Sequence, residues 1–163
     1  MNEIKTIETP QRRGACAADE PWRRQLFAQL RGLQPELLVA CPELLEQQWQ
    51  LQQRVFASEY PDACTELVLL GGTPVGILVW HEGKTIIRLL EIGLEQRYRG
   101  RGLGEQVLSE LIRHADQQGK VLALAVMRHN PALRLYKRLG FSLQNDSDES
   151  VQVQMRREPM RSA

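Results

Sequence analysis

The sequence of 163 residues predicts an α/β protein of the α+β type, with a single mixed, mostly antiparallel, twisted β-sheet flanked by helices. Three observations predict this class. Apolar runs separated by turn residues indicate an antiparallel meander in mid-chain, two amphipathic segments precede it, and a helix–strand–helix pattern follows it. The length and the hydrophobic content of 42% suit one domain over residues 1–163.

Composition excludes several classes of protein. With 21 Lys and Arg against 20 Asp and Glu the net charge is +1, so no bulk field attracts a nucleic acid. The cysteines are Cys16, Cys41 and Cys64, an odd number without a CxxC pair, which disfavours a disulfide framework and a structural zinc site. No apolar run is long enough to cross a membrane, and the N-terminus lacks the apolar core of a signal peptide. We therefore expect a cytoplasmic protein with no metal site and no nucleic-acid or membrane partner.

The first sixty residues predict one strand and two helices. Residues 4–8 form the candidate strand, and a polar stretch follows at 11–20. Asp19-Glu20-Pro21 is typical of a helix start, and apolar residues at helical spacing continue to a stop at Gly32. A second amphipathic helix is expected from near Pro42 to Tyr60, before Pro61.

The middle of the chain changes period. Apolar runs at 65–70, 74–80 and 85–94, separated by Gly-containing turns, predict three antiparallel strands. The next apolar stripe begins at Leu103 and predicts a helix that Gly119 caps. The wholly apolar segment 121–127 predicts a buried strand, and a parallel crossover connects it to the meander.

The last forty residues predict a short helix and a hairpin. Asn130-Pro131 supplies a cap and a first helical residue, and Gly140 ends the helix. Residues 141–143 and 151–155 form the hairpin, and the tail after Arg156 is expected to fray.

The strongest local motif is Arg99-Gly100-Arg101-Gly102-Leu103-Gly104, between a predicted strand and a predicted helix. A helix N-terminus presents unpaired N–H groups and the positive end of a dipole. Three glycines allow phosphate oxygens to approach those groups, and Arg97, Arg99 and Arg101 add positive charge. The motif therefore predicts a pyrophosphate cradle.

Two familiar phosphate-binding motifs do not fit the segment. A dinucleotide fingerprint needs a glycine at position 105 or 107, where Glu105 and Val107 stand, and a Walker loop needs Gly-Lys-Ser/Thr. A flexible arginine-rich turn that binds RNA is the other alternative. The aromatic content of 6% disfavours it.

Two motifs together give a family resemblance. Arg99-x-x-Gly102-x-Gly104 resembles the R/Q-x-x-G-x-G/A signature of the GNAT superfamily of N-acetyltransferases, and residues 130–141 resemble its second motif, which ends in L-Y-x-x-x-G-F. The resemblance covers a core at 65–155 and implies the acyl-CoA N-acyltransferase (GNAT) fold. The helices at about 20–60 would then lie on the substrate side.

The resemblance implies acetyl-CoA, or another short acyl-CoA, as cofactor. Backbone amides of the glycine turn would hold its pyrophosphate; these residues are Arg99, Gly100, Arg101, Gly102, Leu103 and Gly104. The end of the preceding strand, Ile92-Gly93-Leu94, would run beside the pantetheine, and one of its amides would stabilise the oxyanion. The family often carries a bulge where Gly93 stands. Such a bulge would splay this strand from 121–127 and leave the thioester in the gap.

The second motif implies one catalytic side chain and two further cofactor contacts. Tyr136 matches the tyrosine that gives a proton or hydrogen bond to the leaving thiolate; the alternative is a tyrosine that only packs under its helix. Asn130 and Ala132 would contact the cofactor. Asn130 lies one position away from the usual family asparagine, where His129 stands, whereas its capping role follows from its place directly before Pro131.

No general base is evident from the sequence. Segment 121–127 contains no carboxylate, which weakens the interpretation as a ribosomal-protein N-acetyltransferase. Glu91 is the candidate, since strand alternation groups it with Leu89 and Gly93 and allows it to face an amine. A surface position on the other face is the equal alternative. Weaker candidates are His81, Glu59 and Tyr60, and His129 is expected to be a loop residue.

The predicted function is therefore an N-acetyltransferase that acts on a primary amine of a small molecule or peptide. The alternative is a non-catalytic acyl-CoA-binding or regulatory domain on the same fold. The acceptor stays open: acidic residues could attract a cationic amine or could form a solvated surface. These acidic residues are Glu36, Glu43, Glu46, Glu59, Asp62, Asp146, Asp148 and Glu149. A homodimer is implied only by the resemblance.

Overall fold

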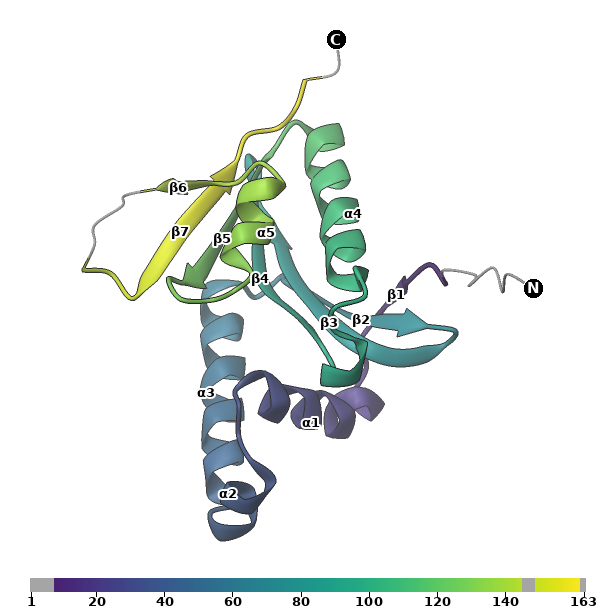
Figure 1. Ribbon diagram of the computed structural model, residues 1–163, viewed down its shortest axis with the longest axis vertical. Coiled ribbons are helices and arrows are strands. Elements are labelled where there is room, and N and C mark those ends of the chain that lie inside the picture. The colour runs from purple at the N-terminus through teal and green to yellow at the C-terminus, as the bar shows by residue number, and fades with distance from the viewer. Residues whose placement is uncertain (1–7, 145–148, 162–163) are drawn as a thin grey trace.

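The computed structural model describes residues 8–144 and 149–161, and the account below concerns these residues. Seven strands form one sheet, and helices flank it (Figure 1). The strands are β1 (Gln11–Gly14), β2 (Cys64–Leu70), β3 (Thr73–Glu82), β4 (Ile86–Leu94), β5 (Val121–Met127), β6 (Ser142–Gln144) and β7 (Gln152–Arg157). The α-helices are α1 (Glu20–Leu30), α2 (Pro35–Ala40), α3 (Glu43–Glu59), α4 (Leu103–Gln118) and α5 (Leu133–Arg138). Single 3-10 turns lie at Ala17–Asp19 and Gln96–Tyr98.

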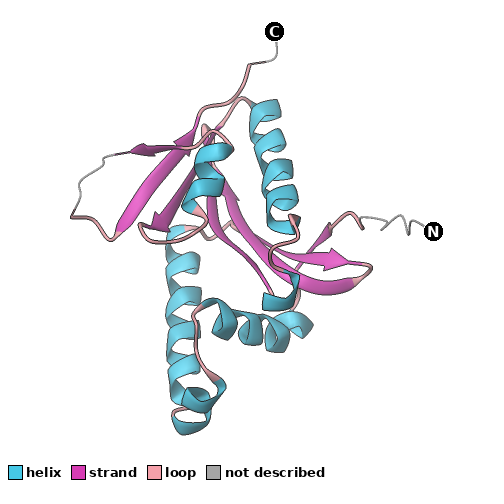
Figure 2. Cartoon of the chain, viewed as in Figure 1, coloured by secondary structure: helices cyan, strands magenta, loops and turns pink. Residues whose placement is uncertain are grey.

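The sheet order is β1-β2-β3-β4-β5-β7-β6, and only the β4–β5 pair is parallel. The predicted mixed, mostly antiparallel sheet is thereby confirmed, including its three-stranded meander. The pairing of β4 with β5 stops early, since it joins only residues 86–89 to residues 121–124. Beyond these residues β4 and β5 diverge (Figure 2).

Helices cover both faces of the sheet. Val107, Leu108 and Leu111 of α4 and Tyr136 of α5 pack on one face with Leu78 of β3. On the other face, Leu26 of α1 packs with Ile77 and Val79 of β3, and Phe56 of α3 joins this second core. Alternation along β3 thus separates the two cores, as expected for a strand buried on both sides.

Two predictions at the N-terminal end need correction. The stretch predicted as a polar connection contains β1, which pairs antiparallel with β2 from Gln11↔Leu69 to Gly14↔Glu66. Its side chains show no apolar alternation because it is an edge strand held by backbone bonds. The predicted strand at 4–8 lies outside the described residues except for Glu8, which is not in a strand. The short helix α2 was also absent from the prediction.

Other elements begin or end differently from expectation. Helix α5 starts at Leu133 rather than Pro131, because Pro131 and Ala132 form a turn before it. In α3, which the sequence predicts as an amphipathic helix, the apolar side chain of Val55 is 40% exposed. The tail is ordered beyond Arg156: Arg157 is 7% exposed and ends β7. Its guanidinium donates to Asp116 Oδ1 at 2.6 Å and to the Leu139 carbonyl at 3.1 Å.

Replacement of Arg157 by Met should destabilise the fold by about 3 kcal/mol, because it leaves a partly buried carboxylate and a carbonyl without their donor. The expected fall in Tm is roughly 10 °C for a chain of this size. Gln154→Ala, at an exposed position of the same strand, is the matched control and should change stability by less than about 0.5 kcal/mol. If Arg157→Met melts at the same temperature as the wild type, the pair of Arg157 with Asp116 contributes nothing to the stability of the fold.

Candidate active site

The glycine turn leads from β4 into α4. Gly100 and Gly102 have φ angles of +74° and +79°, a region that side chains disfavour, and Gly102 is the N-cap of α4. A Cβ atom built on either would meet no atom within 4 Å, so this side of the turn is open. Arg99 Nε donates to the Leu94 carbonyl at 2.9 Å and so fixes the turn to the end of β4.

The first turn of α4 presents unpaired donors. The first backbone bond of the helix is from Gln106 N–H to Gly102 O at 3.1 Å. Among the described residues, no acceptor is bonded to the N–H groups of Leu103, Gly104 and Glu105, and Gly102 has no side chain to cap them. These amides and the helix dipole favour an anion at this point.

The arginines of the turn do not all face the same way. Arg99 lines the groove between α4 and α5, whereas Arg97 lines a separate surface hollow. The Arg101 guanidinium lies 5.6 Å from the centre of the Tyr98 ring, and Arg101 does not line the groove. The structure thus does not bring Arg101 together with the other predicted cofactor-binding residues.

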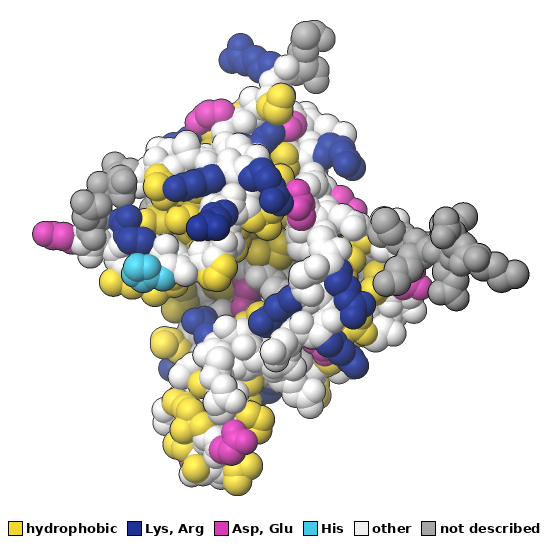
Figure 3. Space-filling view, in the orientation of Figure 1, with side chains coloured by type: hydrophobic (Ala, Val, Ile, Leu, Met, Phe, Trp, Pro, Cys, Tyr) yellow, Lys and Arg dark blue, Asp and Glu magenta, His cyan; other side chains and the backbone are white. Residues whose placement is uncertain are grey.

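A groove of about 700 Å³, here called the α4–α5 groove, runs from the turn toward the sheet. Lys and Arg side chains stand around the hollow on this face of the molecule (Figure 3). Its volume suits a small-molecule site. Eleven of the predicted site residues line it: Ile92, Gly93, Leu94, Arg99, Gly100, Gly102, Leu103, Gly104, Asn130, Ala132 and Tyr136.

A bulge in β4 decides which way its side chains point. The register against β3 pairs Val79 with Glu91 but Trp80 with Leu89, so Leu90 is the extra residue. The bulge therefore lies at Leu90 and not at Gly93, which pairs regularly with Ile77. The expectation of a bulge at Gly93 is wrong.

Gly93 has a different role, because it admits a side chain from α1. A Cβ atom at Gly93 would lie 2.5 Å from Leu30 Cδ1. Leu30 thus packs directly on the β4 backbone and holds the C-terminal end of α1 against the sheet. A close approach of this kind requires glycine.

The divergence of β4 and β5 opens a second hollow of about 350 Å³, here called the β4–β5 gap. Ile92, Asn130 and Tyr136 line both the gap and the α4–α5 groove, so the two are continuous. Asn130 Oδ1 accepts the Ala132 N–H at 2.9 Å within the turn before α5, but the N-cap of the helix is Ala132, so the prediction that Asn130 caps this helix is wrong. His129 is an exposed loop residue.

Tyr136 is buried at the junction of groove and gap, with an exposure of 7%. Its ring packs edge-on against Phe141 at 5.7 Å. Burial raises the pKa of its phenol, so the hydroxyl keeps its proton at neutral pH. In the described structure the hydroxyl has no hydrogen-bond partner, and it is available as a donor.

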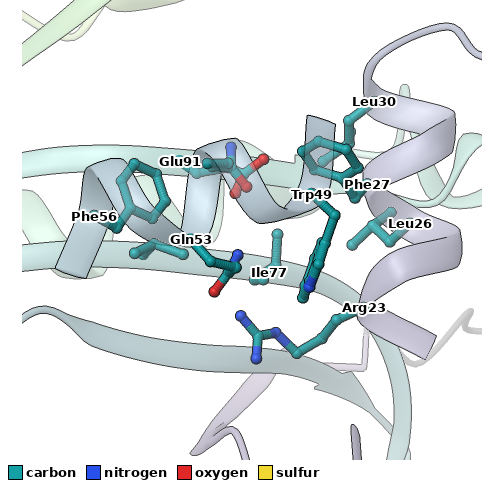
Figure 4. Close-up of a pocket in the computed structure, with 11 residues that line it drawn as sticks. Arg23, Leu26, Phe27, Leu30, Trp49, Gln53, Phe56, Ile77 and Glu91 are labelled. Carbon is teal, nitrogen blue, oxygen red and sulfur yellow. The ribbon is translucent and has the colours of Figure 1, made fainter. Parts of the chain in front are cut away.

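Glu91 lies on the α1–α3 side of the sheet. Because the bulge places Leu90 and Glu91 on the same face, Glu91 shares this face with Gly93 and not with Leu89, which packs in the α4 core. Its side chain lies beside α3, across from Arg23 (Figure 4). Glu91 also lines the β4–β5 gap. The carboxylate is therefore neither a surface group nor in the alternation that the sequence predicted.

The environment of Glu91 is mostly apolar. Desolvation raises the pKa of the carboxyl, while the positive charges of Arg31 and Arg23 and a hydrogen bond with the Gln52 side chain oppose that rise. The cavity between α1, α3 and Glu91 has a volume of about 10 Å³, enough for about one water molecule. The larger of the two hollows that Glu91 lines is the gap.

Comparison with known proteins decides the family. A sequence model of the Acetyltransferase (GNAT) family matches residues 19–141, which include the glycine turn and the segment around Tyr136. The chain belongs to the GNAT family.

Similar proteins agree with this membership. The chain is 36% identical over 70 residues to a mycothiol acetyltransferase of Corynebacterium aurimucosum (40% of this chain, 23% of the relative). It is 36% identical over 58 residues to a spermine/spermidine N(1)-acetyltransferase of Bacillus subtilis (34% of this chain, 38% of the relative). The matches thus span less than half of either curated relative.

A solved structure shows the same fold. The PaiA N-acetyltransferase of Thermoplasma acidophilum, in complex with coenzyme A, is 16% identical and has a TM-score of 0.65 over 92% of this chain and 99% of that one. The GNAT fold expected from the sequence is confirmed.

The candidate site contains residues that the sequence did not indicate. Leu30 and Arg138 line the α4–α5 groove, and Arg138 forms an ion pair of 2.7 Å with Glu105. Arg31 lines the gap. Arg138 could have been found from its place two residues after Tyr136, whereas Leu30 and Arg31 carry no sequence signal for this site.

The other general-base candidates and the acidic residues predicted to attract an amine lie elsewhere. The His81 and Tyr60 rings are 5.3 Å apart, and neither residue lines the groove or the gap. The described acidic candidates are exposed and also lie outside both: Glu36, Glu43, Glu46, Glu59, Asp62 and Glu149. Asp146 and Asp148 lie outside the described residues. No described helix is both long and apolar enough to cross a membrane, and no three metal-ligating side chains cluster in the described chain.

Glu91→Gln should raise the stability of the protein at pH 8. A carboxyl whose pKa is higher in the folded than in the unfolded state binds its proton more tightly when folded, so its ionisation destabilises the fold. The gain in stability over the wild type should be full above the pKa of Glu91 in the folded state. It should vanish as the pH falls below the unfolded-state pKa of about 4.3. Thermal unfolding from pH 4 to 8 measures it, with the exposed Glu59→Gln as control. A gain that does not depend on pH would exclude desolvation of Glu91 as its cause.

Proposed function

We propose that the protein transfers the acetyl group of acetyl-CoA, or another short acyl group, to a primary amine by direct attack in a ternary complex. The observation that carries this proposal is the continuity of the α4–α5 groove with the β4–β5 gap at Tyr136. The groove begins at free helix amides and ends at a buried phenol, as the two ends of an acyl-CoA require. Both curated relatives are named acetyltransferases, one for mycothiol and one for spermine and spermidine, which supports the reaction but no particular acceptor.

The residues present fit an acyl-CoA. The open side of Gly100 and Gly102 and the free N–H groups of Leu103 to Glu105 suit a pyrophosphate. Arg99 and Arg138 line the same groove and add positive charge. An acyl thioester supplies an electrophilic carbonyl and a thiolate leaving group. Ile92, Gly93 and Leu94 line the groove where β4 has left β5, and their backbone can pair with an extended ligand.

Two side chains would move protons. The Tyr136 hydroxyl would donate to the leaving sulfur, since burial keeps it protonated and it has no competing acceptor. Glu91 would accept a proton from the amine, directly or through a water, because it lines the gap and its pKa is raised toward the working range. A backbone N–H near Ile92–Leu94 would stabilise the oxyanion.

Thermal unfolding with coenzyme A and acetyl-CoA tests the cofactor site. A ligand at 100 times its Kd should add about 2.7 kcal/mol of stability, a rise in Tm of several degrees. Release of the coenzyme A thiol with a panel of amines then tests the reaction. No shift with either compound would overturn the proposal. A shift without turnover on any amine would favour a non-catalytic acyl-CoA-binding domain.

A further inference from the structure

The β4–β5 gap opens into a second groove along α3. This α3 groove has a volume of about 560 Å³ and a largely apolar lining of Phe27, Leu51, Val55, Phe56 and Leu90, with Gln48 and Gln52 beside it. Leu51 and Val55 are 63% and 40% exposed, so the apolar surface is open to a ligand. Arg31 and Leu90 line both this groove and the gap, which places them at the junction.

Arg31 is held at this junction by the packing of α1. It directly follows Leu30, whose side chain lies against Gly93 of β4. Its guanidinium lies 5.1 Å above the Phe27 ring. In the described chain Arg31 forms no ion pair with a carboxylate, although its charge acts on Glu91. A cation fixed by an aromatic face and left without a carboxylate partner is suited to bind an anionic group of a ligand.

One positively charged and one negatively charged side chain lie at the junction. Among the described residues that line the gap and the α3 groove, Arg31 is the only cationic side chain and Glu91 the only acidic one. A polyamine would find a single carboxylate and an opposing arginine. A molecule that carries one ammonium and one carboxylate would meet a partner for each.

The geometry points to an α-amino acid with a large apolar side chain as the acceptor, in extension of the proposed acyl transfer. Its amino group would lie in the gap beside Glu91, its carboxylate on Arg31 and its side chain over Leu51, Val55 and Phe56. The amine and the carboxylate of an α-amino acid are attached to one carbon, so their binding partners must lie close together. Arg31 meets this need because it lines both the β4–β5 gap, where Glu91 lies, and the α3 groove. The reaction forms an amide C–N bond and breaks the thioester C–S bond. The ammonium loses two protons, one to the coenzyme A thiol and one to solvent.

A substrate series tests the role of the carboxylate. Thiol release from acetyl-CoA would be followed with L-phenylalanine, L-phenylalaninamide, phenethylamine and spermidine. We expect kcat/KM to fall about 10- to 100-fold when the carboxylate is removed, as for loss of a hydrogen-bonded ion pair. Spermidine should be poorer still.

Variants assign that effect to a residue. In Arg31→Ala the preference for L-phenylalanine over phenethylamine should fall to less than about threefold, and Arg31→Lys should restore part of it. Arg113→Ala, an exposed arginine on α4, is the matched control and should retain the full preference. Calorimetry supplies a readout apart from turnover: L-phenylalanine should bind the coenzyme A complex of the wild type but not of Arg31→Ala, while both proteins bind coenzyme A equally.

The outcomes separate the two proposals. If the protein binds coenzyme A, three results overturn the amino-acid acceptor and leave the acyl-transfer proposal standing. These are equal use of phenethylamine and L-phenylalanine, a preference for spermidine, and no binding of L-phenylalanine. Absence of coenzyme A binding overturns both.

Discussion

Gly104→Glu should abolish coenzyme A binding without unfolding the protein. Gly104 lies in the first turn of α4 and lines the α4–α5 groove, and its N–H group has no acceptor. A glutamate there places a side chain and a negative charge where the pyrophosphate is proposed to bind. The expected loss of affinity is at least about 100-fold, equivalent to about 2.7 kcal/mol. Isothermal titration with coenzyme A measures it.

The same position offers its own control. A Cβ atom at Gly104 would meet only Leu94 Cδ1, at 3.8 Å, which is an ordinary contact. Gly104→Ala should therefore bind coenzyme A and gain about 0.5–1 kcal/mol of stability, because alanine favours the helix. An acidic residue in the first helical turn also favours the helix dipole, so Gly104→Glu should remain folded. Wild-type affinity in Gly104→Glu would exclude the helix N-terminus as the pyrophosphate site.

Tyr136→Phe should lower kcat by about 100-fold or more, the usual contribution of a positioned proton donor. The ring stays in place against Phe141, and the lost hydroxyl has no hydrogen-bond partner in the described structure, so folding and coenzyme A affinity should be unchanged. Because burial raises the pKa of the phenol, the wild-type rate should show no loss from Tyr136 ionisation below about pH 10. Steady-state kinetics from pH 6 to 10 with a reactive amine provide the measurement.

Tyr60→Phe, outside the groove and the gap, controls for the loss of a tyrosine hydroxyl as such. An unchanged kcat in Tyr136→Phe, under conditions where acyl transfer limits the rate, would remove Tyr136 from the reaction. A parallel fall in coenzyme A affinity would instead assign the residue to binding.

The elements that the sequence predicted well are those with strong local signals. The meander, helix α4 and strand β5 follow from apolar periods and from the glycines that end them. The elements it missed lack such signals. Strand β1 is polar and depends on the backbone of β2 for its pairing, and α2 has only six residues. The ordered end of β7 depends on the contact of Arg157 with Asp116, which lies on a different element.

The candidate site divides along the same line. Its groove residues were predictable because the glycine turn and the helix of Tyr136 are short continuous motifs. The backbone conformation of each motif depends on residues within that motif. The side of β4 on which Glu91 lies was not predictable, because one extra residue at Leu90 reverses the alternation. Arg101 belongs to the motif but turns toward Tyr98 and away from the groove.

The sequence by itself determined the fold class, the family, the glycine turn and the position of Tyr136, since these depend on spacing within single segments. The tertiary structure alone decided that β4 bulges at Leu90, that Leu30 packs on Gly93, and that Arg31 stands beside Glu91 at the opening of the gap. The physical reason is that each of these features requires side chains from distant segments to share space. No periodicity or motif within a single segment contains that information.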